Sequence, residues 1–268
     1  MTYIDTHAHA FSHHANFLPT ARYTPSYTAS VEDYIQNLDH HGFDKGVLIQ
    51  PSFYGTDNSY MLSAIASYPE RLKGIAVLDN NTEILTLRNL DNQGIVGIRL
   101  NLFGLPCPDL TQVDWQVFLK NIADMNWQIE LHAPPTYLIQ LLPKLKPYTI
   151  DVAIDHFGRF DPIKGVDDPN YQLFLDMLDP NQHWVKVSGY YRLDDDLNIK
   201  NAADAFKLLK QRGMESRLIW GSDWPHTQHE SQMSFDKALS SFKKIVDDEK
   251  LVTQILTRNN ADLFGFLN

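Results

Sequence analysis

The run Tyr3-Ile4-Asp5-Thr6-His7-Ala8-His9 decides how the fold is interpreted, because it predicts a strand that ends in two histidines. Its apolar start is typical of a short buried strand, and alternate side chains of a strand point to the same side. We therefore expect His7 and His9 to project together from the carboxyl end of a first strand. Two surface histidines near a loose terminus would give the same pattern, so the motif needs support from the rest of the chain.

Similar apolar runs, rich in β-branched residues, recur along the chain and alternate with segments of helical periodicity. Strands are predicted at residues 3–7, 46–50, 74–78, 96–100, 128–132, 151–155, 184–188 and 218–222. Helical segments are predicted at residues 31–41, 61–68, 115–125, 137–145, 172–178, 202–211 and 235–246. Two stretches without helical period, residues 11–30 and 157–170, are predicted to form long loops over the end of the barrel described next.

Eight strands alternating with helices in 268 residues predict an α/β fold, a (β/α)8 TIM barrel formed by residues 1–268 as a single domain. Parallel strands need helical crossovers, and a chain of this length suffices for one such barrel. An open, doubly wound parallel sheet is the alternative. The first strand lacks the glycine-rich turn that binds dinucleotide phosphates, which favours the barrel.

Composition restricts the class of partner. The chain has 33 acidic and 23 basic side chains and a net charge of -10, which argues against binding to nucleic acid or to an anionic membrane surface. A small anionic substrate, bound by local arginines, remains compatible with this charge. The single cysteine, Cys107, excludes an internal disulfide, and no signal peptide or membrane-spanning run is recognised. We expect a cytoplasmic protein, and the sequence leaves the oligomeric state open.

A barrel would bring the residues at the carboxyl ends of its strands to one mouth, where barrel enzymes place their chemistry. Those residues are His7, His9, Arg99, Asn101, His132, His156, Ser188, Tyr190, Tyr191, Arg192 and Asp223. Imidazole nitrogens with one carboxylate suit a first-row divalent metal such as zinc. We expect the metal ligands to be His7, His9, His132 and Asp223. His156 is left outside this set as an acid or base.

In these motifs the chain resembles the amidohydrolase superfamily, and within it the branch of 2-pyrone-4,6-dicarboxylate lactonases. The resemblance spans nearly the whole length. It rests on Asp5-Thr6-His7-Ala8-His9, Glu130-Leu131-His132, Asp155-His156-Phe157-Gly158-Arg159, Lys186-Val187-Ser188-Gly189, Gly221-Ser222-Asp223-Trp224-Pro225-His226 and Asn259-Asn260-Ala261-Asp262-Leu263-Phe264.

The resemblance implies hydrolysis of a carboxylate-bearing lactone, of the pyrone dicarboxylate or sugar-acid type. Asp223 would be the general base that deprotonates the attacking water, and His156 would stabilise developing charge. His7, His9 and His132 would polarise the lactone carbonyl directly or through a metal. The resemblance implies that Arg99, Arg159 and Arg192 bind the substrate. Tyr190 and His226, which follow the ends of the seventh and eighth strands, are further candidates for substrate binding.

The metal count also follows from the resemblance. Two-metal relatives bridge their ions with a carbamylated lysine or a glutamate from the fourth strand, and Gly97-Ile98-Arg99-Leu100-Asn101 contains neither. We therefore expect one divalent ion, zinc, with metal-free catalysis as the alternative, since some lactonase relatives work without metal.

Other activities remain open at this stage. Relatives with a similar single-metal ligand set include metal-dependent decarboxylases. Lactone isomerisation, as in a related enzyme, is a third possible activity. A barrel that binds small anions without catalysis is the non-enzymatic alternative.

Overall fold

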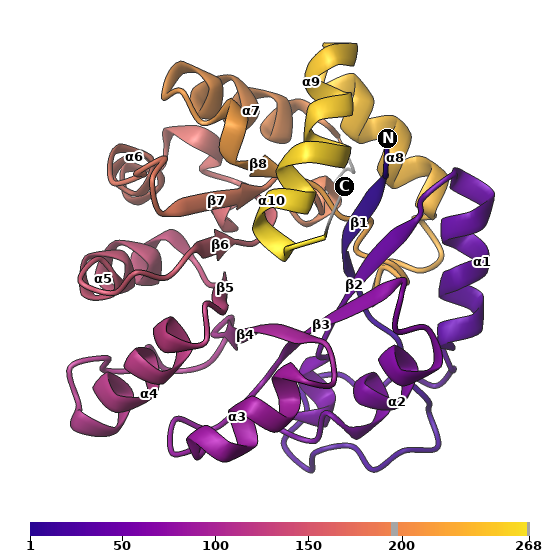
Figure 1. Cartoon of the computed structure of the whole chain (residues 1–268). Helices are drawn as coiled ribbons and strands as arrows, with labels where there is room; N and C mark the ends of the chain where they lie inside the picture. Colours follow the sequence, from indigo (N-terminus) through magenta and orange to yellow (C-terminus); the bar gives the residue numbers. More distant parts are fainter. Residues whose placement is uncertain (194–197, 267–268) are drawn as a thin grey trace.

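The computed structural model describes residues 1–193 and 198–266, and eight parallel strands form one sheet in sequence order. Figure 1 shows the helices arranged in a ring around these strands. The strands are β1 (Ile4–Ala8), β2 (Lys45–Ile49), β3 (Leu72–Ala76), β4 (Ile95–Asn101), β5 (Gln128–His132), β6 (Val152–Ile154), β7 (His183–Lys186) and β8 (Leu218–Ile219). The predicted (β/α)8 TIM barrel is confirmed.

The barrel closes between its last and first strands through the residues that follow β8. The amides of Thr6 and His9 donate to the carbonyls of Trp220 and Trp224, at 3.3 and 2.8 Å, and the amide of Asp223 donates to the carbonyl of His7 at 2.8 Å. Gly221 is required at this seam, because a Cβ there would lie 2.3 Å from the backbone nitrogen of His7. These contacts bring the end of β8 against the His7 motif.

The α-helices of the ring are α1 (Val31–His41), α2 (Ser59–Ser67), α3 (Ile84–Asp91), α4 (Val113–Asp124), α5 (Pro135–Leu145), α6 (Pro169–Asp176), α7 (Lys200–Gln211) and α8 (Phe235–Val246), followed by α9 (Glu249–Gln254) and α10 (Asn260–Phe264). Short 3-10 turns include η1 (Ser52–Tyr54), η2 (His156–Gly158) and η4 (Tyr190–Arg192). A π-helical turn, η6 (Ile255–Asn259), joins α9 to α10.

Local sequence explains where the helices begin and end. Helix α1 starts at a capping box, in which the hydroxyl of Ser30 accepts from the amide of Asp33 and the Asp33 carboxylate accepts in return. It ends at Gly42, which adopts a φ of 74° and bonds back to the last turn. Each predicted helical segment overlaps an observed helix, whereas α3, α9 and α10 were not predicted.

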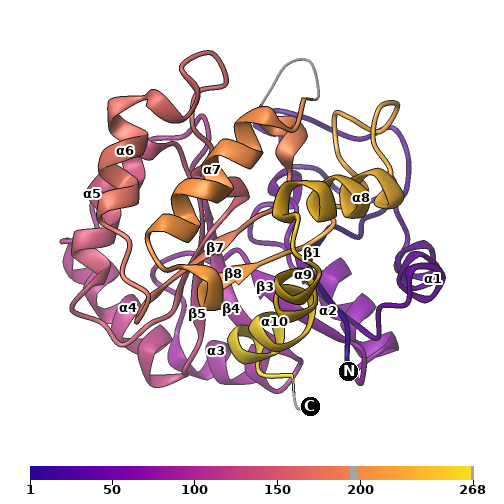
Figure 2. The ribbon, with the colours of Figure 1, turned by 90° about the horizontal axis from the view of Figure 1, so that it is seen from above.

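Residues 11–30 form the predicted long loop after β1. Its ends are held together by an antiparallel bridge between Phe11 and Ala29, and its aromatic side chains pack with Phe53. The hydroxyls of Tyr23 and Tyr27 both donate to Glu230 Oε1, at 2.9 and 2.8 Å. This ties the loop to the segment before α8, and Figure 2 shows the two lying near each other.

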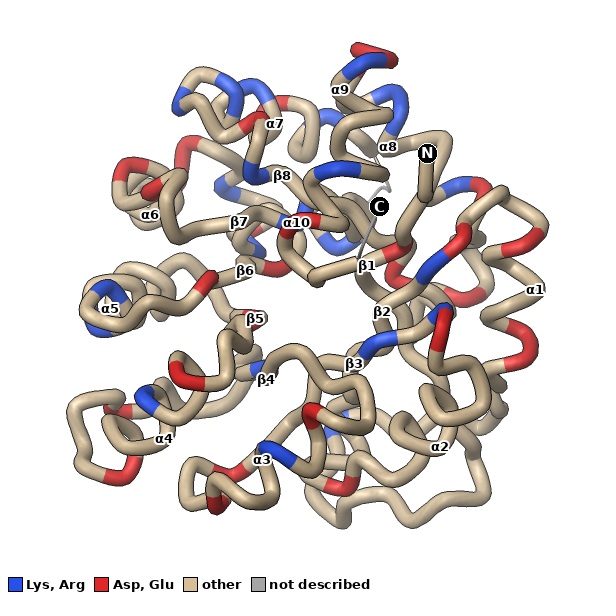
Figure 3. The backbone as a smooth tube through the Cα atoms, in the orientation of Figure 1, with Lys and Arg blue, Asp and Glu red and all other residues tan. Residues whose placement is uncertain are grey.

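Acidic and basic positions are mixed over the outer helices (Figure 3). Among the described residues, no helix is long and apolar enough to cross a membrane.

Candidate active site

A pocket of about 310 Å³ lies at the carboxyl ends of the strands. It is lined by residues from several strand ends and from the loop at residues 11–30, so distant parts of the chain share one cavity. The lining includes His9, Arg22, Arg99, Asn101, Phe103, His132, His156, Arg159, Arg192 and Asp223.

The two histidines of the first motif converge as their spacing predicted. His7 Nε2 and His9 Nε2 lie 3.3 Å apart, and both side chains are buried. His9 Nδ1 is 2.7 Å from the carbonyl of Ile49, which can only accept, so the Nε2 of His9 is left as an acceptor. Burial lowers the pKa of His7 well below its usual range and that of His9 to about 4. Both rings are therefore neutral near pH 7.

Asp223 faces these rings from the other side of the barrel seam. Its Oδ1 is 3.8 Å from His7 Nε2 and 3.9 Å from His9 Nε2. Its Oδ2 accepts from the hydroxyl of Tyr191 at 2.6 Å and from Arg192 Nε at 2.7 Å. Burial raises the pKa of Asp223, but the charge and hydrogen bond of Arg192, together with the nearby His156 and His9, hold the pKa well below the usual range. Asp223 is thus an ionised acceptor.

His156 approaches the same carboxylate. Its Nε2 is 3.9 Å from Asp223 Oδ2, and its Nδ1 is 3.1 Å from Ser188 Oγ. Burial lowers the pKa of His156 to about 3, so the ring is neutral. Gly189 makes room for it, because a Cβ there would lie 2.6 Å from His156 Nδ1.

Beneath the histidines lies a group of buried charges that sequence reasoning did not single out as functional. Lys186 Nζ contacts Glu130 Oε2 at 2.6 Å, Asp155 Oδ1 at 3.1 Å and His7 Nδ1 at 2.8 Å. Arg99 Nη2 contacts Asp155 Oδ2 at 2.8 Å, and Arg99 Nε contacts Glu130 Oε1 at 3.3 Å. Two cations and two carboxylates thus compensate one another without solvent. Burial, and then the nearby Asp155, raises the pKa of Glu130 to about 7.

A signal for this group was present in the sequence. Glu130 lies between the apolar Ile129 and Leu131 in β5, and Lys186 follows the apolar Trp184 and Val185 at the end of β7. Charged side chains are rarely buried without a partner. Glu130 and Lys186 each belong to a motif that carries the resemblance to the lactonases. Their separation in the sequence does not show that the two side chains are in contact.

The three predicted arginines all line the pocket, but they differ in how far their charge is already compensated. Arg99 and Arg192 are paired with carboxylates, as described above. Arg159 donates to the carbonyl of Arg192, and its guanidinium lies 4.5 Å from the ring centre of Phe103. Its Nε is buried without a hydrogen-bond partner. Burial, and then the neighbouring Arg192, lowers the pKa of Arg159 to about 10, so it keeps its charge.

Two residues predicted to bind substrate lie elsewhere. The hydroxyl of Tyr190 is directed to Met233 Sδ at 3.5 Å, and the next residue, Tyr191, is the one that contacts Asp223. Consecutive side chains of the short turn η4 point in different directions, and the position of a residue after a strand does not predict that direction. His226 Nδ1 is 3.3 Å from the Tyr191 hydroxyl, so His226 lies behind that tyrosine.

His132 lines the pocket but stands apart from the other predicted metal ligands. Its Nδ1 is 3.0 Å from Asn101 Oδ1, and its ring stacks on Phe103 at 5.5 Å. Its Nε2 is buried without a partner. Burial, and then the charge of Arg99, lowers the pKa of His132 well below the usual range.

The described residues include a group that could hold a metal ion, namely His7, His9 and Asp223. Ligands at ordinary Zn–N and Zn–O distances in a tetrahedral site are about 3.3 Å apart, close to the separation of the two Nε2 atoms. The donor set therefore fits one ion. Because Lys186 donates to His7 Nδ1, the proton of the neutral ring resides on Nε2, and binding an ion there would displace it.

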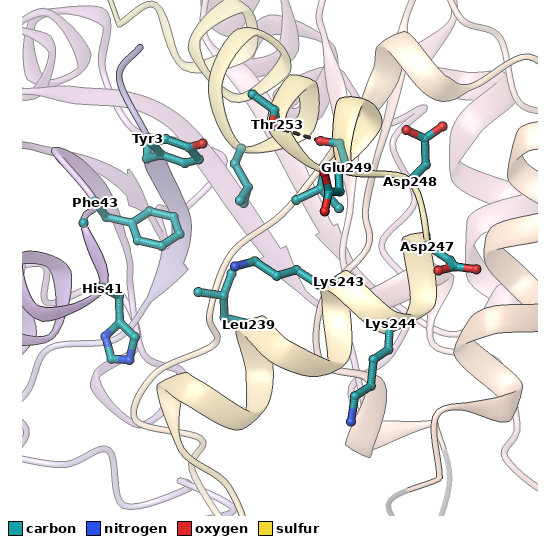
Figure 4. Close-up of a pocket in the computed structure, with 13 residues that line it drawn as sticks. Tyr3, His41, Phe43, Leu239, Lys243, Lys244, Asp247, Asp248, Glu249 and Thr253 are labelled. Atoms are coloured by element: carbon teal, nitrogen blue, oxygen red, sulfur yellow. Dashed lines mark hydrogen bonds between the residues drawn. The ribbon is translucent and has the colours of Figure 1, made fainter.

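A larger cavity of about 780 Å³ lies at the opposite end of the barrel, beside Tyr3 and Phe43, which precede β1 and β2. In Figure 4, Lys243 extends toward these two rings, whereas Lys244 and Asp247 point away from them. The buried histidine and carboxylate groups described above lie at the other end.

Comparisons with known proteins identify the family of this chain. The model of the amidohydrolase family matches residues 4–266. The chain is 28% identical to a 4-sulfomuconolactone hydrolase of Hydrogenophaga intermedia, covering 97% of this chain and 88% of that protein. It is also 28% identical to a 2-pyrone-4,6-dicarboxylate hydrolase of Comamonas testosteroni, covering 97% and 89%.

A solved structure from Acinetobacter baumannii, of a probable 2-pyrone-4,6-dicarboxylic acid hydrolase with citric acid bound, is 55% identical. It superposes with a TM-score of 0.98 and covers 99% of this chain and 100% of its own. The resemblance inferred from the motifs is confirmed, and the chain belongs to the amidohydrolase family.

Proposed function

We propose that this protein hydrolyses a lactone that carries carboxylate groups, with 2-pyrone-4,6-dicarboxylate as the leading substrate. The observation that carries the proposal is the ionised Asp223, whose Oδ1 faces two neutral histidines in an arginine-lined pocket. Relatives named as lactone hydrolases, and a similar structure with citrate, a carboxylate-rich anion, support the reaction class and the charge of the substrate.

Asp223 acts as the general base. Its Oδ1 accepts a proton from water as the water oxygen bonds to the lactone carbonyl carbon. The ring C–O bond then breaks, and the proton passes from Asp223 to the leaving oxygen. Tyr191 and Arg192 hold Oδ2, so the carboxylate cannot rotate away during this transfer.

The neighbouring side chains stabilise and orient the reacting group. His156, neutral and fixed by Ser188, is placed to donate to the oxyanion that develops at the carbonyl. Arg159 has donor capacity left to bind a substrate carboxylate, since its Nε has no partner. Lys186 contacts Nδ1 of His7, which leaves the Nε2 of His7 directed at His9 and Asp223.

We also propose that His7, His9 and Asp223 hold one zinc ion, with the unpartnered Nε2 of His132 as a further donor near the substrate. Such an ion would polarise the lactone carbonyl and lower the pKa of a bound water.

The experiment is mass analysis of the product from 2-pyrone-4,6-dicarboxylate. We expect the product to gain one water, with a new carboxylate in place of the ring ester. Loss of carbon dioxide would identify a decarboxylase instead, and an unchanged mass with a new chromatographic position would identify an isomerase. Binding without any change in the compound would leave only the anion-binding alternative.

A further inference from the structure

Not every arginine that lines the pocket has its charge compensated by a carboxylate of the protein. Arg99 is paired with Asp155 and Glu130, and Arg192 is paired with Asp223. A guanidinium that is already paired with a buried carboxylate has fewer free N–H donors and less uncompensated charge with which to bind a substrate carboxylate. Of the arginines predicted from the sequence, only Arg159 has no carboxylate partner among the described residues.

Arg22 supplies a second free cation, from a loop that sequence reasoning left without a function. It lines the same pocket as Arg159. Within the described part of the chain it makes no hydrogen bond or ion pair, and its side chain is exposed to solvent. Its guanidinium packs over Gly104, with Nη1 2.8 Å from the point where a Cβ on that glycine would lie.

The loop that carries Arg22 is held in place by contacts on both sides. Tyr23 and Tyr27 share the carboxylate of Glu230. Gly104, with a φ of 75°, leaves the space that the guanidinium occupies, and any larger residue there would meet it. A loop held in this way loses less conformational entropy when its arginine binds an anion than a free loop would.

We propose that Arg22 is a specificity-determining residue that binds the second anionic group of the substrate, while Arg159 binds the first. The site then selects dianionic lactones over monoanionic ones. The identification of the ligand as a lactone rests on the proposed function, whereas the selection for two anionic groups rests on Arg22 and Arg159 alone.

The test uses two non-hydrolysable probes, isophthalate with two carboxylates and benzoate with one. Calorimetric Kd values are measured for the wild type, Arg22→Gln and the control Arg88→Gln, which changes an exposed arginine on α3. We expect Arg22→Gln to weaken isophthalate about 10- to 100-fold more than it weakens benzoate, since a hydrogen bond between charged groups is lost. Arg88→Gln should change neither Kd.

Gly104→Ala provides a second variant that leaves Arg22 intact. The added methyl group displaces the guanidinium, so the preference for isophthalate over benzoate should fall in the same direction. Equal Kd changes for the two probes in Arg22→Gln, or no change at all, would overturn the inference.

Kinetics separate this inference from the proposed function. With 2-pyrone-4,6-dicarboxylate as substrate, Arg22→Gln should raise KM far more than it lowers kcat, because Arg22 binds away from the reacting carbonyl. If the wild type hydrolyses no lactone but its isophthalate binding still depends on Arg22, the proposed reaction fails and the dianion selectivity stands.

Discussion

Asp223 is the residue at which the chemistry of the site converges, because one oxygen is anchored and the other faces the histidines. Asp223→Asn keeps the shape but removes the proton acceptor. We expect kcat to fall about 10²- to 10⁴-fold, the usual contribution of a general base. Steady-state kinetics with circular dichroism as a folding control would measure this. A variant with nearly normal kcat would exclude Asp223 as the base.

The low pKa of Asp223 also predicts how activity depends on pH. The group is needed ionised, and Arg192 makes the largest of the contributions that keep it so at low pH despite burial. Replacing Arg192 with Gln removes that charge, so the pKa of Asp223 should rise and the acid limb of kcat/KM should move to higher pH. Arg192→Lys retains a positive charge and should return the limb toward its original position. An unmoved limb in Arg192→Gln would show that another group controls it.

At the scale of the elements, the turns after the strands aim the side chains. Gly189 follows β7 with a φ of 61°, and Gly213 follows α7 with a φ of 71°, but only Gly189 touches the site. The left-handed conformation disfavours a Cβ and should cost about 1–2 kcal/mol of stability in each change to Ala, with a further cost in Gly189→Ala from the contact with His156. Thermal unfolding of both variants would measure that cost.

Only Gly189→Ala should also lower kcat, because its methyl group would displace the ring of His156, whereas a Cβ on Gly213 would meet no atom within 4 Å. We expect a loss of about 10-fold or more, from a catalytic group moved by an ångström or so. Equal activities in the two variants would mean that the position of His156 does not matter.

The same distinction explains how much the sequence could predict. Strand ends follow from apolar runs, and parallel pairing brings them to one mouth. The sequence therefore predicts that His7, His9, His156 and Asp223 lie together, and Asp223 lies within 3.9 Å of all three rings. Side chains beyond the strand ends depend on turn geometry, so the sequence does not show that Tyr191 contacts Asp223 whereas Tyr190 is directed to Met233. Arg22 was missed because the path of a long loop depends on tertiary contacts such as those of Glu230, which no local periodicity encodes.

At the scale of the whole molecule, the proposed metal site lies across the seam that closes the barrel. His7 belongs to β1 and His9 follows it, whereas Asp223 comes after β8, so an ion held by all three would join the two ends of the sheet. Ligand that binds only the folded state stabilises it, by about 4 kcal/mol at 1,000 times its Kd. For a domain of this size that corresponds to a rise in Tm of roughly 10 °C.

We therefore expect zinc to raise the Tm of chelator-treated protein, and His9→Asn to reduce that rise because one donor is weakened. Displacement of the proton on His7 Nε2 adds a further expectation, since zinc binding should release protons to the buffer. Calorimetry in buffers of different ionisation enthalpy would count them. An unchanged Tm with zinc, together with full activity after chelation, would contradict the metal site and leave the neutral His7 ring to face the lactone directly through its Nε2–H.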